Sequence, residues 1–102
     1  MIPLLRLPAR NVYYLPRTAP AVFFLADREA GGVLVNTPAF SPPLVAEFNR
    51  LAPLKFAFFP SRLGARDIAA WRSAGVRLIA YGDELAGCGA TADVALDRGW
   101  RF

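Results

Sequence analysis

Few residues in this chain are suited to chemistry, and histidine is absent from it altogether. Arg62, Arg66 and Asp67 stand close together, at the start of a segment with helical spacing. Because guanidinium groups beside a helix N-terminus favour phosphate or carboxylate, these residues form a candidate anion or partner site. The alternative is that Arg66 and Asp67 are solvated residues of the first helical turn, where the helix dipole favours aspartate.

The remaining nucleophiles and acids offer little. Cys88 is the only cysteine, so the chain forms neither an internal disulfide nor a Cys/His zinc site. It lies between Gly87 and Gly89, and a reactive thiol needs a neighbouring base or cation. With no histidine to act as that base, a small packed or loop cysteine is favoured. Asp83 and Glu84 are the only adjacent carboxylates, and a helix start explains them better than acid–base catalysis does.

Cofactor and phosphate motifs are also missing from the sequence. Neither GxGxxG nor GxxxxGK[S/T] occurs, so the glycines are interpreted as turn residues and no cofactor is expected. The net charge of +4 comes almost wholly from arginines that are spread along the chain without a cluster. Because a basic patch needs local density, nucleic acid is not an expected partner.

Composition indicates one domain over residues 1–102, with 55% hydrophobic and only 20% charged residues. Small domains bury a low fraction of their surface, so some of this apolar material is left over and points to a partner. The first ten residues lack the features of a signal peptide, and no apolar run approaches the length of a membrane span. The cytoplasm is therefore the expected location.

The first third of the chain predicts strands joined in hairpins. Mostly apolar runs cover residues 2–7, 11–15, 21–26 and 33–36, and the second of them is rich in aromatic and β-branched residues. Pro3 and Pro8 restrict the first of these strands to a sheet edge. Gly31 and Gly32 suit a hairpin turn that needs positive φ.

Helices and strands then alternate along the chain. Ser41 as N-cap and Pro42 at the first helical position begin a helix that Pro53 closes. Further along, the pattern predicts a strand at 55–59, a helix at 65–74 ending at Gly75, a strand at 76–80, a turn capped by Asp83 and one or two short strands in 93–102. This order predicts an α/β fold with a mixed β-sheet, an antiparallel meander followed by β-α-β-α-β, with helices on one face.

Three segments give this layout a resemblance to a known family. They are Val33-Leu34-Val35-Asn36-Thr37-Pro38, Phe58-Phe59-Pro60 and Gly75-Val76-Arg77-Leu78-Ile79-Ala80. The chain resembles the N-terminal half of the metallo-β-lactamase-like hydrolase fold. In that family an Asp-Thr-Gly-type turn ends a meander strand, a later strand leads into a His-x-His-x-Asp-His loop, and a glycine and a strand follow. The resemblance implies half of an αββα sandwich.

The departures from that family decide the chemistry. Aligned on the strand end, the metal loop falls on residues 61–66, and its ligand positions hold Ser61, Leu63, Ala65 and Arg66. Leucine and alanine cannot coordinate a metal, serine is a poor ligand, and a protonated arginine repels a divalent cation. The turn aspartate is replaced by Asn36. The resemblance therefore comes without a metal site or catalytic residues, and a metal-activated hydroxide has nothing to form on.

Adjacent aromatic residues lead to a hypothesis about assembly. The doublets Tyr13-Tyr14, Phe23-Phe24 and Phe58-Phe59 lie in predicted strands, where neighbouring side chains point to opposite faces. In the resembled family two halves pack sheet on sheet, so a lone half leaves one apolar face in water. We expect a homodimer through the exposed sheet face or edge, with a hetero-partner as the alternative.

Three functional hypotheses follow. The first is a non-catalytic interaction or structural protein, a degenerate metallo-β-lactamase-like half-domain that acts as a homodimer. The second is a module that binds a small anionic ligand, phosphate or nucleotide, through Arg62 and Arg66. The third is a residual, metal-independent hydrolase.

Overall fold

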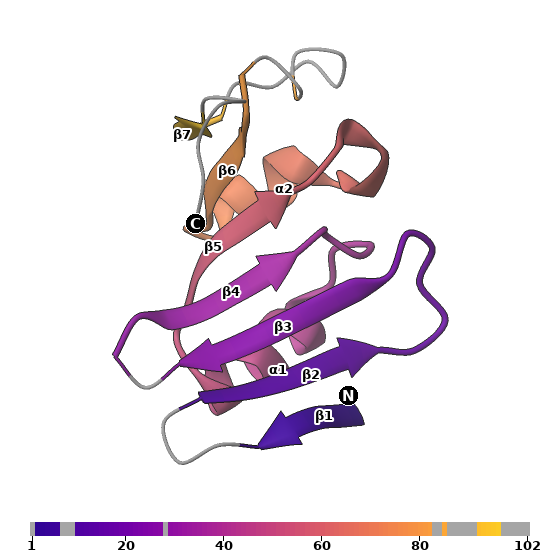
Figure 1. Cartoon of the computed structure of the whole chain (residues 1–102), viewed down its shortest axis with the longest axis vertical. Coiled ribbons are helices and arrows are strands. Elements are labelled where there is room, and N and C mark those ends of the chain that lie inside the picture. Colours follow the sequence, from indigo (N-terminus) through magenta and orange to yellow (C-terminus); the bar gives the residue numbers. More distant parts are fainter. Residues whose placement is uncertain (1, 7–9, 28, 83–84, 86–91, 97–102) are drawn as a thin grey trace.

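In the computed structural model, residues 2–6, 10–27, 29–82, 85 and 92–96 are described. Their strands lie side by side in sequence order in one mixed sheet, with two α-helices beside it (Figure 1). The strands are β1 (Ile2–Arg6), β2 (Arg10–Leu15), β3 (Val22–Asp27), β4 (Gly31–Val35), β5 (Leu54–Phe59), β6 (Arg77–Tyr81) and β7 (Val94–Leu96). The helices are α1 (Pro42–Leu51) and α2 (Ile68–Ser73), preceded by the 3₁₀ turn η1 (Arg62–Gly64).

Strand direction follows the predicted pattern. Strands β1 to β4 pair antiparallel, and β4 to β7 pair parallel. The change occurs at β4, because α1 is the first connection long enough to return the chain for a parallel strand. Strand β1 lies at one edge of the sheet, as its Pro3 requires. The α/β class with a mixed sheet is therefore confirmed.

The turn between β3 and β4 lies slightly earlier than the sequence predicts. The Asp27 carboxylate Oδ1 accepts hydrogen bonds from the Glu29 and Ala30 amides at 2.8 and 2.9 Å. Gly31 has a φ of +90°, and it already belongs to β4. Gly32 is needed for another reason: a Cβ there would lie 2.5 Å from Cζ of the buried Phe24 ring. The first glycine thus completes the turn and the second makes room for the core.

Helix α1 begins where its sequence predicts. The Ser41 hydroxyl accepts a hydrogen bond from the Leu44 amide at 3.2 Å, and Pro42 occupies the first turn. Phe48 is the fully buried residue of this helix. The Ala52 amide closes the helix on the Phe48 carbonyl at 3.0 Å, just before Pro53. The helix therefore lies with one face against the sheet.

The second helix is shorter than the predicted 65–74. Residues 62–64 form a 3₁₀ turn, and Asp67 adopts a left-handed conformation with a φ of 52°, so α2 starts at Ile68. The backbone of Arg66 is hydrogen-bonded to Thr37 in another loop instead of to the helix. Gly75, with a φ of +96°, follows the helix as predicted.

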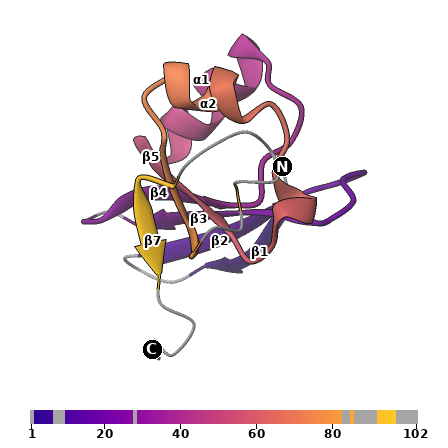
Figure 2. The same cartoon turned by 90° about the horizontal axis from the view of Figure 1, so that it is seen from above.

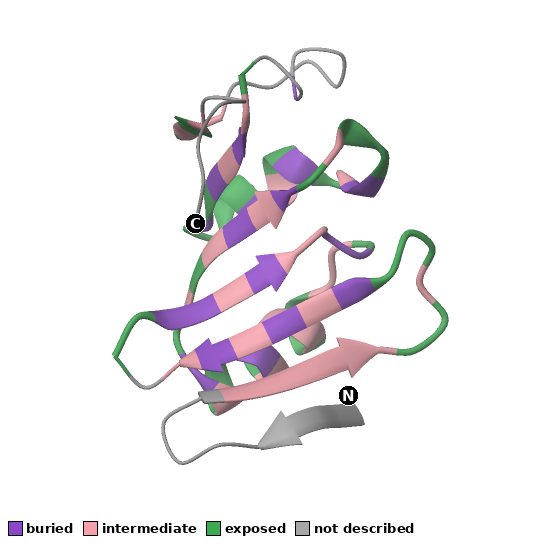
Figure 3. Cartoon of the chain, viewed as in Figure 1, coloured by how far each residue is buried: buried purple, intermediate pink, exposed green. Residues whose placement is uncertain are grey.

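Both helices lie on the same side of the sheet (Figure 2), as two right-handed crossovers require. The core fills the space between them and the strands. The Phe24 and Phe48 rings lie 4.8 Å apart, and the Phe48 and Trp71 rings 6.0 Å apart. Other side chains with almost no exposure include Leu34, Ala57, Phe59, Leu78 and Ala80. Along β3 and the second half of β5 buried and half-buried residues alternate, which Figure 3 shows as bands.

Strand β7 confirms a strand in the tail, while residues 97–102 and the turn predicted at Asp83 lie outside the described residues. Among the described helices, none has the length and apolar character needed to cross a membrane. Asp93 joins β7 to its neighbour. Its Oδ2 accepts a hydrogen bond from the Leu78 amide at 2.7 Å, and its own amide donates to the Leu78 carbonyl at 2.8 Å.

The charge on Asp93 contributes to this junction. The Leu78 amide hydrogen bond is the main reason that the pKa of Asp93 lies below its ordinary value, and the Arg72 guanidinium, 3.5 Å away, adds to the effect. A carboxylate with a lowered pKa stabilises the fold at neutral pH, and this stabilisation is lost as pH falls from about 3.9 through the folded-state pKa.

Asp93→Asn keeps an acceptor for the Leu78 amide but removes the charge. We expect the variant to be less stable than the wild type at pH 7. The difference in unfolding free energy shrinks as the pH falls below about 4, because protonated Asp93 is then also neutral. Urea denaturation of both proteins at a series of pH values measures this. A difference that stays the same at all pH values contradicts the assignment.

Candidate functional site

The loops that follow the parallel strands β4 and β5 are joined by one buried hydroxyl. Thr37, 3% exposed, donates to the Arg66 carbonyl at 2.6 Å and accepts from the Arg66 amide at 2.8 Å. The Thr37 amide also donates to the Gly64 carbonyl at 3.0 Å. Ligands of open α/β sheets bind outside the carboxyl ends of the strands, so this junction lies where a site is expected.

Two further bonds connect the same loops. The Trp71 indole Nε1 donates to the Pro38 carbonyl at 3.0 Å, and the Trp71 side chain is fully buried. The Phe40 amide donates to the Asp67 Oδ2 at 2.8 Å. Asp67 therefore holds the loop before α1, and its carboxylate makes no capping bond to its own helix. The role predicted for it in the first helical turn is replaced by this longer-range contact.

Asn36 occupies the tightest point of the junction. Its φ of 66° is left-handed, a conformation that asparagine tolerates better than most residues. Its amide donates to the Phe58 carbonyl and its side-chain Nδ2 to the Ala21 carbonyl, both at 2.8 Å. A Cβ on Gly64 would lie only 1.8 Å from the Asn36 Oδ1. Glycine at position 64 is therefore required for the two loops to meet.

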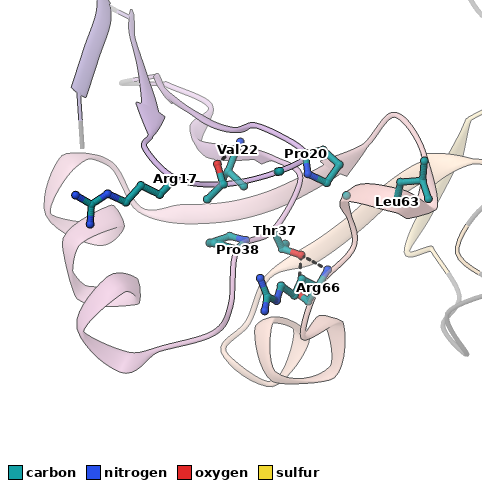
Figure 4. Close-up of a pocket in the computed structure, with 10 residues that line it drawn as sticks. Arg17, Pro20, Val22, Thr37, Pro38, Leu63 and Arg66 are labelled. Carbon is teal, nitrogen blue, oxygen red and sulfur yellow. Dashed lines mark hydrogen bonds between the residues drawn. The ribbon is translucent and has the colours of Figure 1, made fainter.

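A small pocket of about 80 Å³ opens beside this junction (Figure 4). Three segments line it: the turn between β2 and β3, the loop after β4 and the loop after β5. The lining residues are Arg17, Thr18, Ala19, Pro20, Val22, Thr37, Pro38, Leu63, Gly64 and Arg66. Only arginines carry charge in this lining. Arg17 has a left-handed φ of 63°, so the turn presents it in a conformation uncommon for arginine.

The structure divides the predicted anion site. Arg66 lines the pocket, whereas Arg62 and Asp67 do not. The Asp67 carboxylate stands at the start of α2, where its negative charge opposes a bound anion, and α2 is only six residues long. The second arginine of the pocket lining is Arg17, which was not predicted from the sequence. Nothing in the local pattern identifies Arg17, because the pairing of β2 with β3 and of β3 with β4 brings it to the pocket from far away in the sequence.

The positions that the resemblance aligns with a metal loop hold a capping serine and an exposed leucine. The Ser61 hydroxyl accepts a hydrogen bond from the Leu63 amide at 3.2 Å and so caps η1. Leu63 is 77% exposed. Within the described ranges no three residues of the types His, Cys, Asp and Glu gather where they could hold a metal ion. Cys88, Asp83 and Glu84 lie outside the described residues.

A second, larger feature covers the side of the sheet opposite the helices, which we name the open face. The strand register puts one apolar residue beside the next across it, and Figure 2 shows both helices on the other side. Its apolar members are Val12, Tyr14, Phe23, Leu25, Val33, Val35, Phe56, Phe58, Ile79, Tyr81, Val94 and Leu96. All of them are only half-buried.

The centre of the open face is hollowed. A shallow cavity of about 320 Å³ is lined by apolar side chains alone: Leu25, Val33, Val35, Phe58, Ile79, Val94 and Leu96. The Phe58 and Tyr81 rings meet edge to face, with centroids 6.0 Å apart. The Arg77 guanidinium lies 5.9 Å from the centroid of the Phe56 ring. Apolar surfaces of this extent are typical of sites where proteins interact with a partner.

Comparison of the chain with protein-family models, with curated proteins and with solved structures finds no match in any of the three. Function is therefore argued from the pocket and the open face themselves.

The Thr37 hydroxyl gives the first test of the loop junction. Thr37→Val keeps the shape but leaves the Arg66 amide and carbonyl without their partner, which costs about 1–3 kcal/mol of unfolding free energy. Thr37→Ser retains the hydroxyl and is the control, with a smaller loss. Urea denaturation followed by circular dichroism measures both. Equal losses in the two variants would show that the methyl group, and not the hydroxyl, matters.

Proposed function

We propose that this chain is a non-catalytic interaction protein that acts as a homodimer through its open face. The observation that carries the proposal is the continuous apolar surface from β2 to β7, hollowed at its centre and lined there without a polar residue. Burial of apolar surface contributes roughly 25 cal/mol per Å², so leaving this face in water is unfavourable. A symmetric dimer is the most common way for a soluble protein to bury such a surface.

The face is a better interface than the edges of the sheet. Strand β1 forms one edge, and its Pro3 lacks the N–H that pairing with another strand needs. Strand β7 forms the other edge among the described residues, with only three residues. Short edges and edges with proline are the means by which proteins prevent edge-to-edge pairing. We therefore favour sheet packed on sheet over edge paired with edge.

The size of the face suits a modest dimer. Strands are about 4.8 Å apart and rise about 3.3 Å per residue, so the part from β2 to β7 covers on the order of 450 Å² in projection. Two copies with the relief of their side chains then bury a total of about 1,000 Å², the lower limit for a specific interface. We expect a dissociation constant in the micromolar range.

The resemblance to half of a metallo-β-lactamase-like fold enters this proposal as its evolutionary setting. In its favour, the loops aligned with the family's turn and metal loop are adjacent, through Thr37 and Arg66. The second copy then stands where the other half of an αββα sandwich would be. The aligned ligand positions lack metal-binding side chains, so the proposal contains no catalysis. A single cysteine suits the reducing cytoplasm as the location.

The dimer is tested by placing a charge at the middle of the open face. Val33→Asp buries an unpaired carboxylate from each copy, which costs several kcal/mol, so we expect the dissociation constant to rise at least a hundredfold. Ala46→Asp makes the same change of charge on the exposed side of α1 and is the matched control. Sedimentation equilibrium at several concentrations measures both.

Two results would contradict the homodimer. One is a wild-type protein that sediments as a monomer at concentrations up to about 100 micromolar, well above the expected dissociation constant. The other is equal weakening by Val33→Asp and Ala46→Asp, which would assign the effect to net charge instead of to the face. Circular dichroism of each variant checks that the fold is retained.

A second candidate function is binding of a small anion, phosphate or carboxylate, in the pocket at the loop junction. It is favoured by the lining, in which Arg17 and Arg66 are the charged residues and come from separate loops. In Figure 4 the Arg17 side chain extends away from Arg66, so an anion held by both requires Arg17 to turn inward, which its exposure allows. Guanidinium groups bind such oxyanions with charge-assisted hydrogen bonds.

Titration calorimetry with inorganic phosphate tests the pocket. We expect millimolar binding that weakens about tenfold in Arg66→Gln and in Arg17→Gln, because each variant removes one charge-assisted contact. Lys55→Gln removes a positive charge far from the pocket lining and is the control. Binding that is equally weak in all three variants would show nonspecific attraction to a basic protein.

A further inference from the structure

Among the open-face residues whose side chains the structure describes, two at the border carry a charge. On β3, Asp27 follows Leu25 by two positions, and on β6, Arg77 precedes Ile79 by two. Side chains two residues apart point to the same face of a sheet, so both belong to the open face. Strand β3 runs opposite to β4, while β5 and β6 run with β4. The carboxyl end of β3 and the amino end of β6 therefore lie at the same end of the sheet. Asp27 and Arg77, which have opposite charges, both lie at that end.

The positions of these strands are symmetric within the apolar surface. The described apolar residues of the open face extend from β2 to β7, so its centre lies between β4 and β5. Strands β3 and β6 are the next strands outward on either side of that centre. A two-fold axis through the centre and parallel to the strands places β3 of one copy over β6 of the other.

We infer that, given the homodimer proposed above, its two-fold axis lies between β4 and β5 along the strand direction. Asp27 of each copy then pairs with Arg77 of the second copy, and the dimer contains this ion pair twice. Rotation about an axis along the strands does not exchange the two ends of the sheet. The charged end of one copy therefore lies over the charged end of the second copy. An axis across the strands instead places Asp27 over Phe23 and Arg77 over Tyr81 of the second copy, and neither of these carries an opposite charge.

The spacing allows the pair to form. Arg77 is in register with Phe56, which is in register with Val33 and thus level with Leu25. Asp27 lies two residues further along, about 7 Å, a distance that an extended arginine side chain spans. Packed sheets also cross at about 30°, which shifts the ends relative to one another. The Asp27 Oδ1 keeps its bonds to the turn amides, because a carboxylate accepts several hydrogen bonds at once.

A mixing experiment tests this arrangement. Asp27→Arg puts two arginines on each copy, and Arg77→Asp puts two aspartates there, so each variant alone repels itself. We expect the dissociation constant of each to rise at least tenfold, while an equimolar mixture restores an affinity close to that of the wild type as a heterodimer. Native mass spectrometry, with one variant isotopically labelled, measures the fraction of heterodimer.

A second pair of variants protects the test against misfolding, since Asp27 also holds the turn before β4. Asp27→Asn and Arg77→Gln remove the charges and keep polar side chains. If the two residues pair, the double variant dissociates no more than either single one, because the interaction is already lost. Each single variant is expected to raise the dissociation constant about threefold to tenfold.

The outcomes separate this inference from the homodimer itself. A wild-type monomer overturns both. A second outcome is a wild-type dimer that Val33→Asp disrupts, while the charge variants mix only statistically and the neutral variants have additive effects. This outcome supports the homodimer and contradicts the proposed axis. Preferential heterodimer formation together with non-additive neutral variants supports the axis along the strands.

Discussion

One geometric constraint determines most of this structure: strand side chains alternate between faces, but right-handed crossovers place helices on one face only. Helices α1 and α2 both return the chain between parallel strands, so both cover the same side of the sheet. The strands, however, carry apolar residues at nearly every position. Phe24 and Phe59 are buried under the helices, while Phe23 and Phe58 are their counterparts on the open face. The helices therefore cover the apolar side chains on one face of the sheet, while those on the open face are covered by no described helix.

The end of the sheet where α/β proteins carry their chemistry depends on hydrogen bonds between two loops. Thr37 and Asn36 use side chain and backbone to hold the loops after β4 and β5 together, and Gly64 supplies the room. The polar groups of Thr37 and Asn36 are therefore held in place, and their hydrogen bonds are made within the protein and not to a ligand. What it offers to the outside is the positive charge of Arg17 and Arg66. This charge is the reason for proposing that the pocket binds an anion.

Local signals predicted much of the fold. The Ser41-Pro42 pair located the start of α1 because a cap and a proline act within one turn of the chain. Alternating and aromatic runs located the strands, since side-chain period and burial are properties of neighbouring residues. The predicted start of α2 was wrong because Arg66 forms hydrogen bonds with Thr37, 29 residues away, and not with its own helix. A contact across such a separation leaves no local pattern. For the same reason the sequence did not identify Arg17 as a residue of the pocket.

The absence of histidine and the residue types at positions 61–66 are facts of composition, and no fold can change them. The sequence alone therefore determined that no histidine or carboxylate stands at positions 61–66, and it also determined that both faces of its strands are apolar. Only the tertiary structure decided which face the helices cover, and that β3 and β6, the strands of Asp27 and Arg77, are equally far from the centre of the open face. Side-chain identity is set residue by residue, whereas coverage and symmetry arise only once strands distant in sequence pair in a definite order.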